Sequence, residues 1–100
     1  MAEVRLLVTG WNLKRQLITD MTLFAEDGDH RVVGRLPLPP DATATRLELA
    51  PGAYNLYVLF TSLPYIYCAS ADPLAVPDRL AATLDLDKAT IDDVVGPPPS

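Results

Sequence analysis

The chain of 100 residues is long enough for one hydrophobic core and too short for two, so we expect a single domain. Its formal net charge of −5 argues against a nucleic-acid partner, because phosphate binding needs clustered lysines and arginines. Cys68 is the single cysteine, which excludes an internal disulfide framework. Because residues 1–11 also show no signal-peptide pattern, we predict a cytoplasmic protein.

The first predicted strand spans residues 3–9, a short segment that is rich in branched residues and is closed by Gly10. The second spans residues 16–26, where the side chains alternate between an apolar face and a mixed face. Asp27-Gly28 follows as a predicted tight hairpin turn, since this pair tolerates the positive φ angles that such a turn needs.

A third strand is predicted over residues 31–36, on the return from that turn. The prolines within residues 37–41 cannot donate ladder hydrogen bonds, so this segment is predicted as a loop or an edge crossing. Alternation resumes over residues 43–49, which form the fourth predicted strand.

Pro51-Gly52 is predicted to turn this strand into a fifth, over residues 54–60, as a buried hairpin. The fifth strand is apolar on both faces. Its core-facing residues are predicted to be Tyr54, Leu56, Val58 and Phe60, and the other face carries Tyr57 and Leu59. A strand of this kind is normally covered on both faces, so we expect part of the cover to come from another chain.

The sixth predicted strand spans residues 65–70, after Pro64. No charged residue lies between Leu49 and Ala71, a length that could cross a membrane as a helix. Pro51, Gly52 and Pro64 would break such a helix, so we predict no membrane partner.

The segment after Pro73 permits two interpretations. Residues 77–84 could form a short helix that begins at Pro77, or a turn there could lead into a seventh strand over residues 83–87. Residues 90–93 fit a capping box for a last half-turn. We therefore predict an all-β, seven-stranded antiparallel sandwich over residues 1–95, with a proline-rich tail over 96–100.

Pro51-Gly52-Ala53-Tyr54, followed by the alternating core residues of the fifth strand, resembles the Pro-Gly-x-Tyr hairpin of transthyretin-like sandwiches. That group includes carboxypeptidase regulatory-like and Cna-B-type domains. The resemblance implies a prealbumin- or immunoglobulin-like sandwich in which the glycine forms the turn and the tyrosine packs at a corner. The hydroxyisourate-hydrolysing members end in Tyr-Arg-Gly-Ser and use histidines, whereas this chain ends Gly-Pro-Pro-Pro-Ser and has one histidine.

Few residues could carry chemistry. His30 lies beside Asp27 and Asp29, but their spacing matches no calcium or zinc loop, and an exposed turn explains them better. Cys68 and His30 are the candidates for a thiol nucleophile and its base, without a family signature around either. The aspartates near the C-terminus fit a solvated acidic face: Asp85, Asp87, Asp92 and Asp93. We expect no catalytic, cofactor-binding or metal-binding residue, and no cofactor.

We predict a non-enzymatic protein–protein interaction or structural module that associates with itself, with an unidentified protein, or with both. The predicted interface comprises Trp11, Tyr57, Leu59, Tyr65 and Tyr67. Trp11 could instead plug an open end of the sandwich, and the second face of the fifth strand could be covered by Leu80, Leu84 and Leu86. An alternative function is a small acidic inhibitor or adaptor that occupies a basic groove of a host protein. Binding of an apolar ligand between protomers also stays open.

Overall fold

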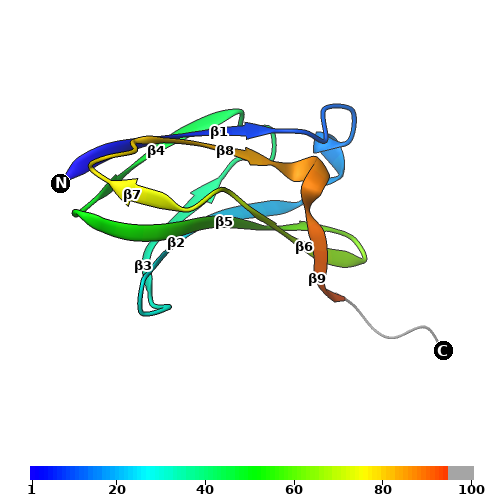
Figure 1. Ribbon diagram of the computed structural model, residues 1–100. Coiled ribbons are helices and arrows are strands. Elements are labelled where there is room, and N and C mark those ends of the chain that lie inside the picture. Colours follow the sequence, from blue (N-terminus) through cyan, green and yellow to red (C-terminus); the bar gives the residue numbers. More distant parts are fainter. Residues whose placement is uncertain (95–100) are drawn as a thin grey trace.

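Two β-sheets lie face to face in the computed structural model, which describes residues 1–94 (Figure 1). The smaller sheet has three strands in the order β4 (Ala44–Leu49), β1 (Ala2–Thr9) and β8 (Ala81–Asp85). β4 runs antiparallel to β1, whereas β8 runs parallel to it. This parallel pair is a departure from the antiparallel sandwich that the sequence predicted.

The larger sheet has six strands, and all of its neighbouring strands are antiparallel. Its main path is β3 (Val32–Leu38), β2 (Asp20–Asp27), β5 (Gly52–Ser62), β6 (Tyr65–Ser70) and β9 (Thr90–Val94), while β7 (Leu74–Val76) pairs with the start of β5. Figure 1 shows the smaller sheet above this one, with β9 descending from the end of β8.

The core lies between the two sheets, because alternate residues of the long strands point toward the opposite sheet. β1 contributes Val4, Leu6 and Val8, all buried. β5 contributes the four predicted residues Tyr54, Leu56, Val58 and Phe60, which confirms the expected inward face. Burial of such side chains contributes about 1.5–3 kcal/mol each, so this strand is central to stability.

The predicted all-β sandwich is confirmed, although residues 1–94 form nine strands and not the seven expected. The two additional strands are short. β7 has three residues, and β9 replaces the half-turn predicted over residues 90–93. Thr90–Val94 extends along β6 because that strand would otherwise leave its backbone groups unpaired at the edge of the sheet.

The second predicted strand begins too early. Arg15–Leu17 forms a 3₁₀ turn, η1, in which the backbone N–H groups of Leu17 and Ile18 donate to Lys14 and Arg15. β2 therefore starts at Asp20. The third strand, by contrast, runs past its predicted end and includes Pro37, which is tolerated because β3 is an edge strand.

The predicted hairpin at Pro51-Gly52 does not form. β4 belongs to the smaller sheet and β5 to the larger one, so the connection at Pro51-Gly52 crosses between layers. Tyr54 lies just after this crossing, buried, and its hydroxyl donates to the carbonyl oxygen of Ala50 at 2.6 Å. This bond fixes the corner where the chain changes sheet.

The short helix over residues 77–84 is also wrong. A turn follows β7, and the chain becomes strand β8 at Ala81, where it pairs with β1 and buries Leu84. The strand alternative predicted over residues 83–87 overlaps β8, but Asp87 belongs to a second 3₁₀ turn, η2 (Leu86–Lys88). The predicted tail, 96–100, lies outside the described residues.

Asp27-Gly28 forms the predicted turn between β2 and β3, with a different source of positive φ. The φ angle is 62° at His30, whereas Gly28 does not have a positive φ. The Asp27 carboxylate accepts hydrogen bonds from the backbone N–H groups of Asp29 and Arg31, at 2.9 Å each. An aspartate that bonds the backbone two and four residues on therefore sets the turn.

Candidate interaction surfaces

The structure places the five predicted interface residues on two different surfaces. Tyr57 and Leu59 lie on the outer face of the larger sheet, turned away from the smaller sheet, and both are half-buried. Trp11, Tyr65 and Tyr67 lie on the inner side, at one end of the sandwich. The alternation of the sequence could place the first pair, but it could not show that the other three face inward.

The outer face of the larger sheet has an apolar centre that spans three strands. Register places Phe24 of β2 beside Tyr57, and Cys68 of β6 beside Leu59. Ile66 lies two residues from Cys68 on the same face. The rings of Phe24 and Tyr57 are stacked with centroids 5.2 Å apart. We call these five residues the outer-face cluster. Phe24 was not predicted. The strand 65–70 was expected to share this face through Tyr65 and Tyr67, whereas the register shows that Ile66 and Cys68 are the residues that join Tyr57 and Leu59.

Charged residues surround this cluster and do not interrupt it. The guanidinium of Arg35, on β3, lies 5.7 Å from the ring centroid of Phe24. On the opposite side, β9 carries Asp92 and Asp93. Burial raises the pKa of the Cys68 thiol, and the charge of Asp92 raises it further, although a hydrogen bond with Ser70 opposes the shift. At neutral pH the thiol therefore stays protonated.

The pKa of Tyr57 is also raised, chiefly by burial and then by the negative charges of Glu26, Cys68 and Asp92.

The C-terminal leucines that might have covered this face lie elsewhere. Leu84 and Leu86 are fully buried in the core, on the side of the smaller sheet, and Leu80 is exposed just before β8. Within residues 1–94, the outer-face cluster is thus left without a covering layer.

The end of the sandwich is closed by Trp11, as one of the two interpretations of this residue predicted. Its ring meets Phe60 edge-on, with centroids 5.0 Å apart, and Tyr67 at 5.1 Å. The ammonium of Lys14 lies over the indole ring, 4.7 Å from its centroid. Trp11 therefore packs against the core and also contacts a cation.

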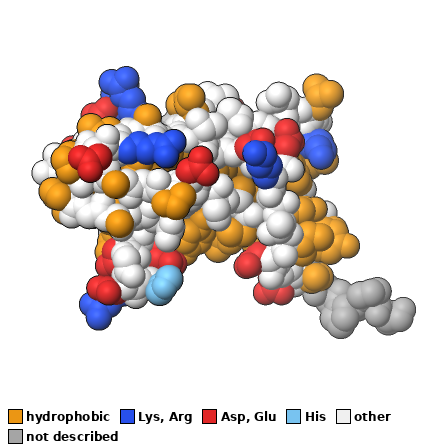
Figure 2. All heavy atoms as spheres, in the orientation of Figure 1, with side chains coloured by type: hydrophobic (Ala, Val, Ile, Leu, Met, Phe, Trp, Pro, Cys, Tyr) orange, Lys and Arg blue, Asp and Glu red, His pale blue; other side chains and the backbone are white. Residues whose placement is uncertain are grey.

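Beyond Trp11, β6 and β9 extend past the smaller sheet. Tyr67 pairs with Ile91 and Tyr65 pairs with Val94, and the two β9 residues are 56% and 58% exposed. Figure 2 shows hydrophobic side chains gathered in this part of the molecule, near the turn between β5 and β6. The sequence did not indicate these β9 residues, because their segment was interpreted as a half-turn.

The loop that carries Trp11 is held by contacts that the sequence did not reveal. The Arg15 guanidinium donates to four backbone carbonyl oxygens: those of Val8, Gly10, Pro40 and Ala42. The backbone N–H of Trp11 donates to the Asp87 carboxylate at 3.0 Å. Asp85 in turn accepts from the N–H of Asp87 at 2.9 Å. Two of the four aspartates expected on a solvated face thus hold the loop and η2 in place.

The residues considered for chemistry do not converge. His30 lies in the β2–β3 turn with its Nδ1 3.0 Å from Glu26 Oε1, whereas Cys68 lies on β6. Among residues 1–94, no group of three or more histidine, cysteine or acidic side chains is placed to hold a metal ion. The described helical segments are all too short to span a membrane.

Comparison of the chain with protein-family models, with curated proteins and with solved structures finds no match. The resemblance to transthyretin-like sandwiches therefore stays a prediction, and the surfaces described above must carry any argument about function.

Proposed function

We propose that this protein is a non-enzymatic interaction module that associates with copies of itself through the outer-face cluster, and that it acts in the cytoplasm. The observation that supports this most directly is the apolar centre of the outer face, with Phe24, Tyr57 and Leu59 side by side and charges only around it. A sheet face that stays in water normally carries polar or charged side chains, because the residues of each strand alternate between a core face and a solvent face. Aromatic residues within a charged rim are typical of protein interfaces.

The arrangement of charge favours a second copy as the partner. Arg35 lies on the β3 side of the outer face, and Asp92 and Asp93 lie on the β9 side. A two-fold axis parallel to the strands would lay the β3 side of one copy over the β9 side of the other. Opposite charges would then meet at both margins, with the aromatic residues between them.

The test is a paired substitution, Tyr57→Lys with Leu59→Glu, which leaves the net charge unchanged. We expect the native chain to associate at high micromolar concentration, and the variant to be folded and smaller by light scattering after size exclusion. The matched control is Leu13→Lys with Leu17→Glu, at positions that are 89% and 54% exposed and outside the cluster. The control should associate like the native chain.

Two results would overturn this proposal. One is a native chain that stays monomeric at high micromolar concentration. The other is a Tyr57→Lys, Leu59→Glu variant that unfolds while the control remains folded, because the face would then be internal to the protomer.

The second candidate is an acidic inhibitor or adaptor that binds a basic groove on another protein. It is favoured by the negative charge of the C-terminal half, where Asp87, Asp92 and Asp93 are exposed. Such a protein can work as a monomer, so a monomeric native chain would favour it over the self-associating module.

A further inference from the structure

The inner face of the larger sheet carries an apolar surface where β6 and β9 extend past the smaller sheet. In the register of these two strands, Tyr65 lies opposite Val94 and Tyr67 lies opposite Ile91, so the four side chains share one face. Tyr67 also lies opposite Phe60, which is fully buried, so this face continues the core. We call Tyr65, Tyr67, Ile91 and Val94 the β6–β9 platform.

The platform is accessible as well as apolar. Ile91 and Val94 are more than half exposed, and the two tyrosines are half-buried. The rings of Tyr65 and Tyr67 meet edge-on, with centroids 6.1 Å apart. Contiguous apolar side chains that stay exposed usually mark a surface that binds something. The platform therefore needs an occupant.

Residues 95–100 continue the chain directly from Val94, the last residue of the platform. Their sequence is Val-Gly-Pro-Pro-Pro-Ser, with no charged side chain and three consecutive prolines. Aromatic side chains line the surfaces that bind proline-rich peptides, because the rigid proline rings pack against them with little loss of entropy. Proline has no N–H, so such a segment offers mainly carbonyl acceptors, and tyrosine hydroxyls are suitable donors.

We infer that the prolines of residues 97–99 pack on the β6–β9 platform of their own chain. β9 runs antiparallel to β6 and reaches Tyr65 at its last residue, so the chain has to reverse before it lies over the platform. Gly96 supplies this reversal, since glycine adopts backbone conformations that other residues rarely adopt.

The dimensions of the platform fit three prolines. In a polyproline II helix the first and third residues lie about 6 Å apart along the axis, and the two tyrosine rings lie 6.1 Å apart. Pro97 then lies over Tyr65, and Pro99 lies over Tyr67. A short connection holds the segment near the platform at an effective concentration of about 1 mM or more, so even a weak contact forms within one chain.

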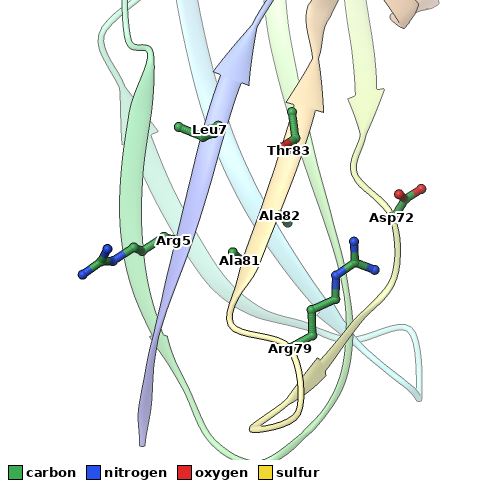
Figure 3. Close-up of a pocket in the computed structure, with 7 residues that line it drawn as sticks. All are labelled: Arg5, Leu7, Asp72, Arg79, Ala81, Ala82 and Thr83. Atoms are coloured by element: carbon green, nitrogen blue, oxygen red, sulfur yellow. The ribbon is translucent and has the colours of Figure 1, made fainter.

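The groove beside β8 is a poorer site for the same segment. It has a volume of about 450 Å³, and Arg79 and Asp72 line it together with Ala81, Ala82 and Thr83 (Figure 3). An uncharged segment would remove water from these charged groups without providing an opposite charge. No aromatic residue of the described chain lines the groove, so proline rings would have no aromatic ring to pack against.

This inference goes beyond the proposed self-association and does not depend on it. The platform lies on the inner face of the larger sheet, whereas the outer-face cluster lies on the opposite face. It provides an occupant for Tyr65 and Tyr67, two of the residues that the sequence predicted as an interface.

The test observes the proline rings of the full chain by NMR. Protons that lie over an aromatic ring resonate upfield, so those of Pro97 and Pro99 should be shifted upfield from their positions in a synthetic peptide of residues 95–100. They should also show nuclear Overhauser effects to the rings of Tyr65 and Tyr67. Proline resonances that match those of the free peptide would overturn the inference.

A pair of matched variants tests the position of the segment. Tyr65→Ala should remove the upfield shift of Pro97 and leave most of the shift of Pro99. The control is Tyr57→Ala, which removes the same side chain from the outer face and should leave both shifts unchanged. If Tyr65→Ala does not fold, Tyr65→Leu keeps an apolar side chain and removes the aromatic ring. Equal effects of the changes at positions 57 and 65 would refute the assignment.

Dilution separates the chain's own segment from that of a second copy. A contact within one chain should give the same proline shifts at millimolar and at tens of micromolar concentration. Shifts that disappear on dilution would assign the segment to a second copy and overturn the inference. If the outer-face proposal fails instead, Tyr57→Ala will not change the size of the protein, and the proline shifts will persist.

Discussion

Replacing Arg15 by alanine should reveal how much the loop around Trp11 contributes to the stability of the sandwich. The guanidinium donates to four backbone carbonyls, which come from the end of β1, the turn after it and the β3–β4 connection. It therefore joins the end of a smaller-sheet strand to the connection between the two sheets, and no other side chain among residues 1–94 forms as many hydrogen bonds. Alanine would leave all four acceptors without this donor.

The magnitude follows from the number of bonds and their burial. A hydrogen bond to a charged group contributes about 1.5–3 kcal/mol when it is buried. These four bonds are only partly buried, so water can replace some of them, and we take ~0.5–1 kcal/mol for each. Arg15→Ala should thus lower the free energy of unfolding by about 2–4 kcal/mol, and the melting temperature by roughly 10 °C or more.

Lysine at position 15 should recover less than half of this loss, because an ammonium group cannot reach four carbonyls from one point. The control is Arg46→Ala, whose side chain is exposed and lies 3.7 Å from Glu3, a contact worth less than about 1 kcal/mol. Urea unfolding followed by Trp11 fluorescence and by circular dichroism measures all three variants. If Arg15→Ala and Arg46→Ala lose the same stability, the four hydrogen bonds do not have the role assigned to them.

Three further outcomes are expected. Gly10→Ala should destabilise the fold by at least ~2 kcal/mol, since φ there is +89° and a Cβ would lie 2.7 Å from the Asp87 nitrogen, whereas Gly28→Ala, with open space around it, should be near neutral in thermal melts. Val58→Asp should abolish cooperative folding, because the side chain is fully buried, and a soluble variant with a cooperative melt would contradict the core assignment. Cys68 should react slowly with iodoacetamide at pH 7, because burial raises its pKa, and more slowly still at protein concentrations that favour association. A rate independent of concentration would argue against the outer face as an interface.

Most of the longer strands could be predicted from local sequence, that is from alternation, from runs of branched or aromatic residues, and from the glycines and prolines at their ends. β1, β4, β5 and β6 lie within two residues of their predicted bounds. The sheet to which each strand belongs could not be predicted in this way, because Pro51-Gly52 permits both a hairpin and a crossing between layers. β4 instead pairs with β1, where Leu49 lies opposite Ala2. Such a pairing between distant segments leaves no local mark in the sequence.

The shorter C-terminal strands were misjudged for a related reason. All residues of β9 are exposed, and an extra residue interrupts its pairing with β6, so its alternation does not reflect burial. β8 begins with two alanines, which favour helix over strand. Its conformation is set by the ladder with β1, which the sequence of β8 does not encode by itself.

The alternation of side chains along β5 placed Tyr57 and Leu59 correctly on the face opposite the core. The other residues of the outer-face cluster could be identified only from the register between strands. Phe24 joins Tyr57 only because β2 pairs with β5 at that residue. The role of Arg15 carried no signal at all, since its partners are backbone carbonyls from three segments. Every residue has a backbone carbonyl, so the sequence cannot show which carbonyls accept from Arg15.

The effect of the outer-face substitutions should depend little on salt. Tyr57→Lys with Leu59→Glu leaves the net charge at −5 and removes mainly apolar area, so the loss of association should persist as salt rises from about 20 mM to 0.5 M. Sedimentation velocity of this variant beside the native chain measures the effect at both salt concentrations. A loss of association that disappears at high salt would show that the contact depends on charge pairs at its margins and not on the apolar outer-face cluster.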